Sequence, residues 1–208
     1  MALACYLYVQ LIHTLPFFPL DLILFPGEQT ALHLFEPRYR ELLKDIEASD
    51  GQFAIPYPEL KGSFRFASVV ELVSVTKRHP SGESDIIIEG KDLGRVKSFQ
   101  PTMEGKLYAG GQVRIYDYMQ NWLANTQVQS ELALLAETLG KKAEIFSTLE
   151  YRQMMRILTS LQLPTDQKHR FLRLKSADQQ QQFLADLLRF SRFIVLQEKK
   201  MVDGIFLN

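Results

Sequence analysis

The sequence predicts an α+β protein in which a β-rich part is followed by an α-helical part. From Phe53 to about Tyr118, short runs of strand-forming residues alternate with turn residues, a pattern more typical of a barrel or sandwich than of a parallel sheet. After Trp122, apolar residues recur every three or four positions, as on one face of a helix. We therefore divide the chain into a β domain at residues 1–122 and a helical domain at residues 123–208.

A tight turn and a helix are predicted near the amino terminus. Pro26 and Gly27 supply the fixed φ and the positive φ that the two central positions of a type II turn require, so two strands should meet there. A helix should begin at Pro37, because proline is favoured at the first helical position and the Glu36 carboxylate suits the positive end of a helix. Its apolar face is formed by Tyr39, Leu42, Leu43 and Ile46.

A β-hairpin and a closing strand are predicted for the middle of the chain. Ala67–Thr76 is the longest β-rich run, and the loop His79–Ser84 after it contains proline and glycine, which indicates a hairpin of two antiparallel strands. Leu107–Tyr118 should form the closing strand. Gly110 and Gly111 within it indicate a bulge or the close approach of another backbone segment.

Four helices are predicted for the second part of the chain. One of them spans Tyr151–Leu161, Thr165 caps a short one, and Ser176 with Gln179 forms a capping box at the start of the longest, which Gly204 should end. The stripes expected to face the core are Val128, Leu132, Leu135 and Leu139 in the first of these helices and Phe183, Leu187, Phe190 and Ile194 in the last.

Composition argues against several classes of protein. Lys+Arg and Asp+Glu both total 24, so the chain has no net charge to neutralise phosphates, and nucleic acid is not an expected partner. Cys5 is the only cysteine, which excludes an internal disulfide and fits the cytoplasm. No stretch approaches the roughly 18 uninterrupted apolar residues of a membrane span. The first fourteen residues lack the basic start of a signal peptide, and we interpret them as a leading strand.

The run from Leu15 to Tyr39 resembles the opening of the Lon protease amino-terminal domain. That family begins with Leu-Pro-x-x-Pro-Leu, continues to Phe-Pro-Gly, and in its stand-alone branch reads Leu-His-x-Phe-Glu-Pro-Arg-Tyr. The matching residues here are Leu15, Pro16, Pro19, Leu20, Phe25, Pro26, Gly27, Leu32, His33, Phe35, Glu36, Pro37, Arg38 and Tyr39. The resemblance implies a PUA-like β-barrel followed by a helical bundle, and a role in substrate recognition.

Motifs for catalysis and metal binding are not found in the sequence. There is no G-x-x-x-x-G-K-[ST] loop to hold ATP phosphates, and the peptidase domain of the Lon family is absent. Four histidines are present, none in the spacing of a metal motif, so neither a metal nor a cofactor is expected. We interpret His33, on a strand, as a structural histidine with its hydrogen bonds satisfied.

These observations predict a non-enzymatic protein that binds unfolded polypeptide or a partner protein, with a protease among the candidate partners. The predicted recognition residues are Arg38 and Tyr39 beside the first hairpin, and Tyr57 and Trp122 near the junction of the two parts. In the alternative, Tyr39 packs the helix onto the barrel, Arg38 satisfies loop carbonyls or carboxylates, and Trp122 wedges the two parts together. An RNA-binding module and a small-ligand-binding protein are the rival functions, and the oligomeric state is left open.

Overall fold

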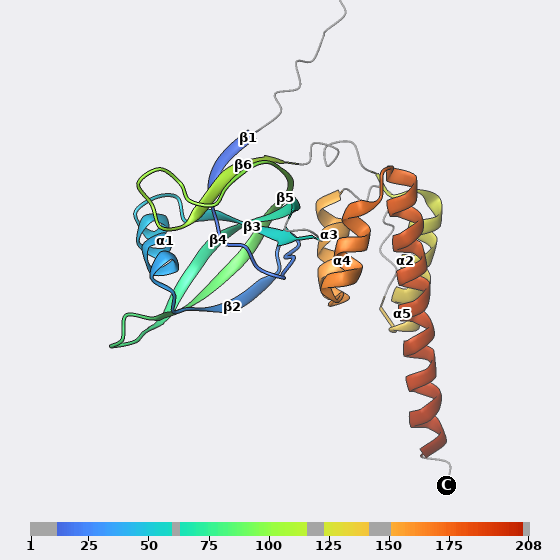
Figure 1. The fold of residues 1–208 in the computed structure, drawn as a ribbon. Helices are drawn as coiled ribbons and strands as arrows, with labels where there is room; N and C mark the ends of the chain where they lie inside the picture. Colours follow the sequence, from blue (N-terminus) through green and yellow to red (C-terminus); the bar gives the residue numbers. More distant parts are fainter. Residues whose placement is uncertain (1–11, 60–62, 116–122, 142–150, 206–208) are drawn as a thin grey trace, which may run out of the picture. The chain divides into compact units, whose positions relative to one another are not determined.

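The structure is a computed structural model that describes residues 12–59, 63–115, 123–141 and 151–205 (Figure 1). The chain divides into two compact units, residues 1–117 and 118–208. The described residues contain six strands and five helices, so the predicted α+β class is confirmed. Among the described helices, none is both long and apolar enough to cross a membrane.

The first unit is a β-barrel with one additional strand. Its strands are β1 (Ile12–Phe17), β2 (Gln29–Leu34), β3 (Gln52–Pro58), β4 (Phe64–Arg78), β5 (Ser84–Gln100) and β6 (Ala109–Ile115). The strand order is β2-β5-β4-β3-β1-β6, and β5 also pairs with β6, so all strands except β2 close into a ring. With 17 residues, β5 is long enough to pair with β2 along its first half and with β6 along its second.

The predicted type II turn is present at Pro26 and Gly27. Gly27 has a φ of +89°, and the Glu28 amide donates to the Phe25 carbonyl at 3.0 Å. The Gly27 amide then donates to the carbonyl of Gly90 and the Gly90 amide to the carbonyl of Glu28, both at 2.8 Å. This pattern places one extra residue opposite Gly90, as in a β-bulge, and fixes where β2 begins.

The turn does not join two strands, contrary to the prediction. Residues 18–25 before it are irregular, and the strand before them, β1, ends at Phe17. Two backbone amides of this stretch bond to side chains and not to a neighbouring strand. The Leu24 amide donates to the Ser68 hydroxyl at 2.9 Å, and the Phe25 amide donates to the Glu28 carboxylate at 2.8 Å. Of the predicted leading strand, residues 1–11 lie outside the described residues.

The predicted hairpin and the close backbone approach are both confirmed. β4 and β5 form an antiparallel pair across the loop of residues 79–83. On β6, a Cβ at Gly111 would collide with the carbonyl oxygen of Ser98 on β5, next to a register shift between Val96 and Ser98. The second glycine of the pair therefore lets two backbone segments approach where the ring closes.

Two apolar clusters stabilise the first unit. The smaller lies among the ring strands and consists of Leu15, Phe17, Ala54, Ala67, Val69, Ala109 and Val113. The larger includes the buried face of helix α1 (Pro37–Glu47), which carries the four apolar residues predicted for it. They pack with Phe18, Leu24, Leu34, Phe53, Ile55, Val70, Ile86, Ile88 and Tyr108.

The described part of the second unit contains four helices, in the order predicted. They are α2 (Thr126–Thr138), α3 (Tyr151–Ser160), α4 (Thr165–Arg173) and α5 (Ala177–Ile205). The Ser176 hydroxyl caps α5 by accepting from the Gln179 amide at 3.2 Å, and the Gln179 side chain accepts from the Lys175 amide at 2.9 Å. Thr165 is the first residue of α4 and Pro164 precedes it as the cap, so the predicted role of Thr165 is wrong by one position.

The predicted core face of α5 is wrong. Leu184, Ala185 and Leu188 are buried, whereas Phe190 is 62% exposed and Ile194 is 39% exposed. The remaining two residues of the predicted stripe are only half-buried. The structure describes α5 as far as Ile205, one residue beyond the glycine that was expected to end it.

Ion pairs with α2 lie beside the face of α5 that packs. The Glu131 carboxylate on α2 lies 2.9 Å from Arg189 and 3.4 Å from Arg192 on α5. These arginines flank the buried leucine face, so their ion pairs agree with the packing of that face toward α2. On α2 the predicted stripe is buried except for Leu139, which lies past the last helical residue and is 46% exposed.

Candidate functional site

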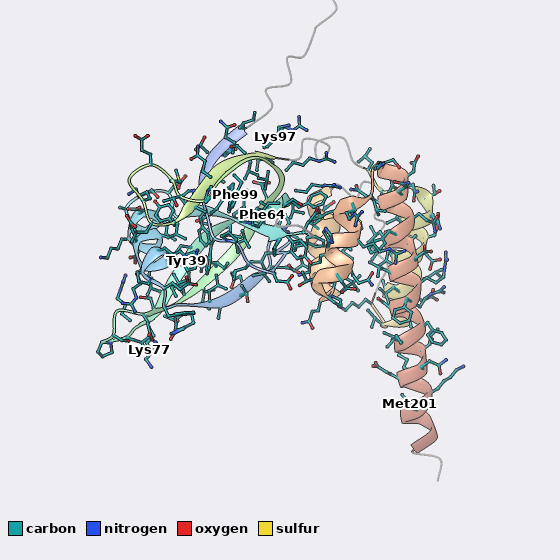
Figure 2. All side chains as sticks on the ribbon, viewed as in Figure 1. Tyr39, Phe64, Lys77, Lys97, Phe99 and Met201 are labelled. Atoms are coloured by element: carbon teal, nitrogen blue, oxygen red, sulfur yellow. The ribbon has the colours of Figure 1, made fainter. Side chains whose placement is uncertain are left out.

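Two of the four predicted recognition residues, Arg38 and Tyr39, lie at the start of α1, and the first is exposed while the second is buried. The Arg38 guanidinium lies 2.8 Å from the Glu36 carboxylate and 4.6 Å from the centre of the Tyr39 ring. Tyr39 itself is only 5% exposed, and its ring centre lies 4.0 Å from that of Phe18 (Figure 2). Burial raises the pKa of its hydroxyl. The Tyr39 ring thus belongs to the core, and only Arg38 reaches the solvent.

Tyr57, the third predicted residue, lies on β3. It is half-buried and falls between Pro56 and Pro58, where the pairing with β4 shifts register. Pro58 is opposite Phe64, and the Phe64 ring stacks on Phe99 with 4.5 Å between their centres (Figure 2). Neither phenylalanine was predicted as a surface residue, since a sequence does not reveal which aromatic side chains a barrel leaves exposed. Trp122, the fourth predicted residue, lies outside the described residues.

A groove of about 550 Å³ lies between α1 and the connection from β5 to β6. Its lining residues are Pro37, Arg40, Glu41, Lys44, Thr102, Met103, Gly105, Lys106 and Leu107. Leu107 is 60% exposed, so the groove offers apolar surface to solvent. The side chains of Arg40 and Lys44 place positive charge along α1, and Glu41 accepts a hydrogen bond from the Leu107 amide at 2.9 Å.

Hydrogen bonds to Asp45 hold the loop that forms the far wall of this groove. The Asp45 carboxylate accepts from Tyr108 at 2.5 Å and from Lys106 at 2.7 Å. These bonds lower the pKa of Asp45, the larger effect coming from Lys106, while burial and the bond to Asp45 raise the pKa of Tyr108. The loop is thus attached to α1 through an ionised carboxylate.

Strand β2 has an unpaired outer edge. It pairs with β5 on one side, and no other strand of the described residues pairs with its other side. Along an antiparallel ladder, residues whose N–H and C=O groups bond to the partner strand alternate with residues whose groups point away from it. The Glu28 carbonyl bonds to the Gly90 amide of β5, so every second residue counted from Glu28 faces β5. The main-chain groups of Ala31 and His33 therefore point away from β5. Phe35 follows the strand and is 56% exposed. In Figure 1, β2 lies at the lower side of the barrel.

Two histidines meet one carboxylate beside this edge. His33 on β2 lies 2.6 Å from Asp85, and His79 lies 2.9 Å from the other oxygen of the same carboxylate. The His33 side chain is 48% exposed, and its second ring nitrogen is 3.4 Å from Glu83. His33 is therefore hydrogen-bonded as predicted but lies at the surface. Linear spacing could not reveal this group, because strand pairing brings its members together.

Comparisons with known proteins agree on the kind of domain to which the chain is similar. The family model described as the ATP-dependent protease La (LON) substrate-binding domain matches residues 14–197. A search of curated proteins found no match.

Two solved structures are similar in fold. The Lon N-terminal domain protein from Xanthomonas campestris has a TM-score of 0.61 at 20% identity, and the alignment covers 85% of this chain and 98% of that one. The N-terminal domain of the Mycobacterium avium complex Lon protease has a TM-score of 0.58 at 16% identity, with coverages of 85% and 98%. At these identities the two structures support the fold alone.

Proposed function

The chain belongs to the family of LON substrate-binding domains, and from this premise we propose that it binds polypeptide segments that lack stable structure. Membership of this family supports a role in substrate recognition. A surface that accepts many sequences has to bind what they share. Every residue except proline carries the same N–H and C=O groups, so hydrogen bonding to the main chain meets this requirement.

The observation that carries the proposal is the outer edge of β2. An extended ligand adds to this edge as a further strand and pairs with the outward main-chain groups of Ala31 and His33. β2 contains no lysine and no proline, the residues with which many proteins protect a strand edge. Phe35, exposed just beyond the strand, supplies apolar contact for the ligand's side chains.

The groove beside α1 supports a second contact in the same proposal. Met103 and Leu107 offer apolar surface to a ligand side chain, while Arg40 and Lys44 favour an acidic residue next to it. Arg38, predicted from the sequence as a recognition residue, stays in the proposal because it is exposed at the start of the same helix. Extended peptides that combine apolar and acidic residues should therefore bind best.

A pair of peptides tests the role of the β2 edge without changing the protein. A fluorescent apolar and acidic peptide is compared with the same peptide carrying N-methyl groups at alternate amides, which removes the donors on one of its edges. We expect the parent peptide to bind and the methylated one to lose roughly tenfold or more in affinity, since several main-chain hydrogen bonds are lost. Equal binding of the two peptides would exclude strand addition.

A matched pair of protein variants tests the same edge from the other side. Ala31→Pro removes an outward amide, whereas Ala31→Val keeps that amide and suits a strand. Binding measured by fluorescence anisotropy should fall for the proline variant and stay at the parent level for valine, with urea denaturation as a check on folding. If both variants bind like the parent, recognition lies elsewhere, and Tyr57→Ala then tests the recognition residue predicted on β3.

We also propose that the chain acts by binding and not by catalysis. Support comes from the matched family model, which describes a substrate-binding domain, and from the lack of a phosphate-binding loop motif in the sequence. The purified protein should neither hydrolyse ATP nor cleave an unfolded casein-like substrate. Turnover that persists at constant specific activity through repeated purification would contradict this.

A further inference from the structure

We propose that His33, His79 and Asp85 bind a divalent transition-metal ion such as Zn²⁺. In the part of the chain that the structure describes, they form a group whose ligand atoms all lie within 4.8 Å of one another. Imidazole nitrogens and carboxylate oxygens are ordinary zinc ligands. The inference is independent of the proposed polypeptide binding, because it rests on side chains and not on the main-chain edge of β2.

Strand pairing fixes the positions of all three residues. His33 on β2 is directly opposite Asp85 on β5, and His79 directly follows the last residue of β4. The loop that carries His79 is closed by two main-chain hydrogen bonds of 2.9 Å, one from the His79 amide to Glu83 and one from the Gly82 amide to His79. Three neighbouring strands therefore hold the group, so little order has to be imposed when an ion binds.

The distances are close to those that a tetrahedral ion requires. Bonds of about 2.0 to 2.2 Å place two ligand atoms roughly 3.3 Å apart around tetrahedral zinc. His33 Nδ1 lies 2.6 Å from Asp85 Oδ1, and His79 Nε2 lies 2.9 Å from Asp85 Oδ2. A metal would thus have to widen these contacts from 2.6 and 2.9 Å to about 3.3 Å. All three side chains are partly exposed, which leaves them free to make this adjustment and gives an ion access.

The charges of the group also favour a dication. Asp85 contributes a carboxylate, and both histidines contact it, one at each of its two oxygens. Glu83, whose carboxylate is 3.4 Å from His33 Nε2, adds a nearby negative charge and can hold the ring through the nitrogen that does not face Asp85. Lys77 is opposite Asp85 on β4 and opposes a cation, but its side chain is exposed. Two imidazoles and one carboxylate are donors that zinc accepts.

Titration of the full chain with ZnCl₂ tests the site. The affinity tag is first removed, because a polyhistidine tag binds the same ions, and Zn²⁺ is measured by competition with a chromophoric chelator. We expect one ion per chain. His33→Gln and His79→Gln should each lower the affinity by about 100-fold or more, since even the loss of a ligand's hydrogen-bonding neighbour costs about 10- to 100-fold. His13→Gln, a histidine on β1 outside the group, is the matched control and should leave the affinity unchanged.

A second measurement uses the unmodified protein, so it holds even if a variant fails to fold. Co²⁺ added to the metal-free chain should give visible absorption bands of a four-coordinate nitrogen and oxygen site, and Zn²⁺ should abolish them. The inference is overturned if these bands are absent. It is equally overturned if both variants bind Zn²⁺ like the parent, or if the control variant loses as much affinity as they do. In those cases His33, Asp85 and His79 are a hydrogen-bonded link between strands and nothing more.

Discussion

In the barrel unit the neighbours of a residue are set by strand register, whereas in the helical unit they depend on which face of a helix packs. His33 lies beside Asp85 because the ladder between β2 and β5 puts them opposite each other. On α5, by contrast, apolar side chains occupy two adjacent faces. The structure buries Leu184 and Leu188 on one face and leaves Phe190 exposed on the other.

This difference shows what a periodic pattern can and cannot predict. A strand has only two faces, so alternation leaves a single choice once one face is known to be inside. A helix turns by roughly 100° per residue, and neighbouring apolar stripes then overlap. For α5 the choice depends on partners outside the helix, among them Glu131 of α2, which pairs with Arg189 and Arg192. Such a long-range pair leaves no mark in the local sequence.

The largest expected effect concerns the helix face itself. Leu184→Ala removes a fully buried side chain and should lower the free energy of unfolding by about 2 to 5 kcal/mol. Phe190→Ala, which truncates a larger but exposed side chain, should change it by less than about 0.5 kcal/mol. Urea denaturation of both variants decides between the two faces. Reversed magnitudes would mean that the stripe predicted from the sequence is the packed one.

In the barrel, the corresponding test concerns a contact between backbone segments. Gly111→Ala places a methyl group against the carbonyl oxygen of Ser98 and the ring of Phe17, so it should destabilise the unit by about 1 to 3 kcal/mol. Gly105→Ala has no neighbouring atom to strike, although its φ of +70° disfavours alanine, and serves as the reference. Thermal denaturation followed by circular dichroism compares them. A Gly111 variant as stable as the parent would show that the ring tolerates a wider spacing there.

Gly27→Ala should have a smaller effect because only the backbone is strained. A Cβ at this position has no atom within 4 Å, but its φ is +89°. The expected loss is about 1 kcal/mol. Gly27→Asn is the informative companion, since asparagine tolerates positive φ better than alanine and should lose less. Equal losses in both variants, measured as denaturation midpoints, would point to a cause other than φ.

The smallest effect is expected at Asp45 and depends on pH. Its pKa is lowered in the folded chain, so it contributes stability above its unfolded pKa, near the ordinary 3.8, and this contribution is lost as pH falls through the folded value. Asp45→Asn should therefore be slightly less stable than the parent at neutral pH and should converge with it in acid. The effect should be small because the pair is partly exposed and is screened by solvent. A gap that widens in acid would contradict this assignment.

Much of the fold followed from local signals in the sequence. Pro26 and Gly27 predicted their turn because only a few residue types suit its dihedral angles, and Pro37 marked the first turn of α1. The irregular stretch of residues 18–25 could not be predicted in the same way. Two of its amides donate to side chains, one of them that of Ser68 far along the chain.

The candidate site was less predictable than the fold. Tyr39 belongs to a distinctive sequence motif, yet its ring packs in the core, since a motif can specify folding as well as recognition. The groove beside α1 depends on a loop that Asp45 draws toward the helix from a distant part of the sequence. Exposure of Phe35 and Leu107 is likewise a result of tertiary packing. Residue types and spacing alone do not contain this information.

Closure of the ring has a consequence for how the chain folds as it leaves the ribosome. The β4–β5 hairpin is local and can form early, but Ile12 on β1 pairs with Arg114 on β6, at the other end of the unit. Synthesis proceeds from the amino terminus, so the pairing of β1 with β6 must wait until nearly the whole unit has emerged. We expect nascent chains that stop before Ala109 to be digested by a protease, and chains that extend well past Ile115 to resist it.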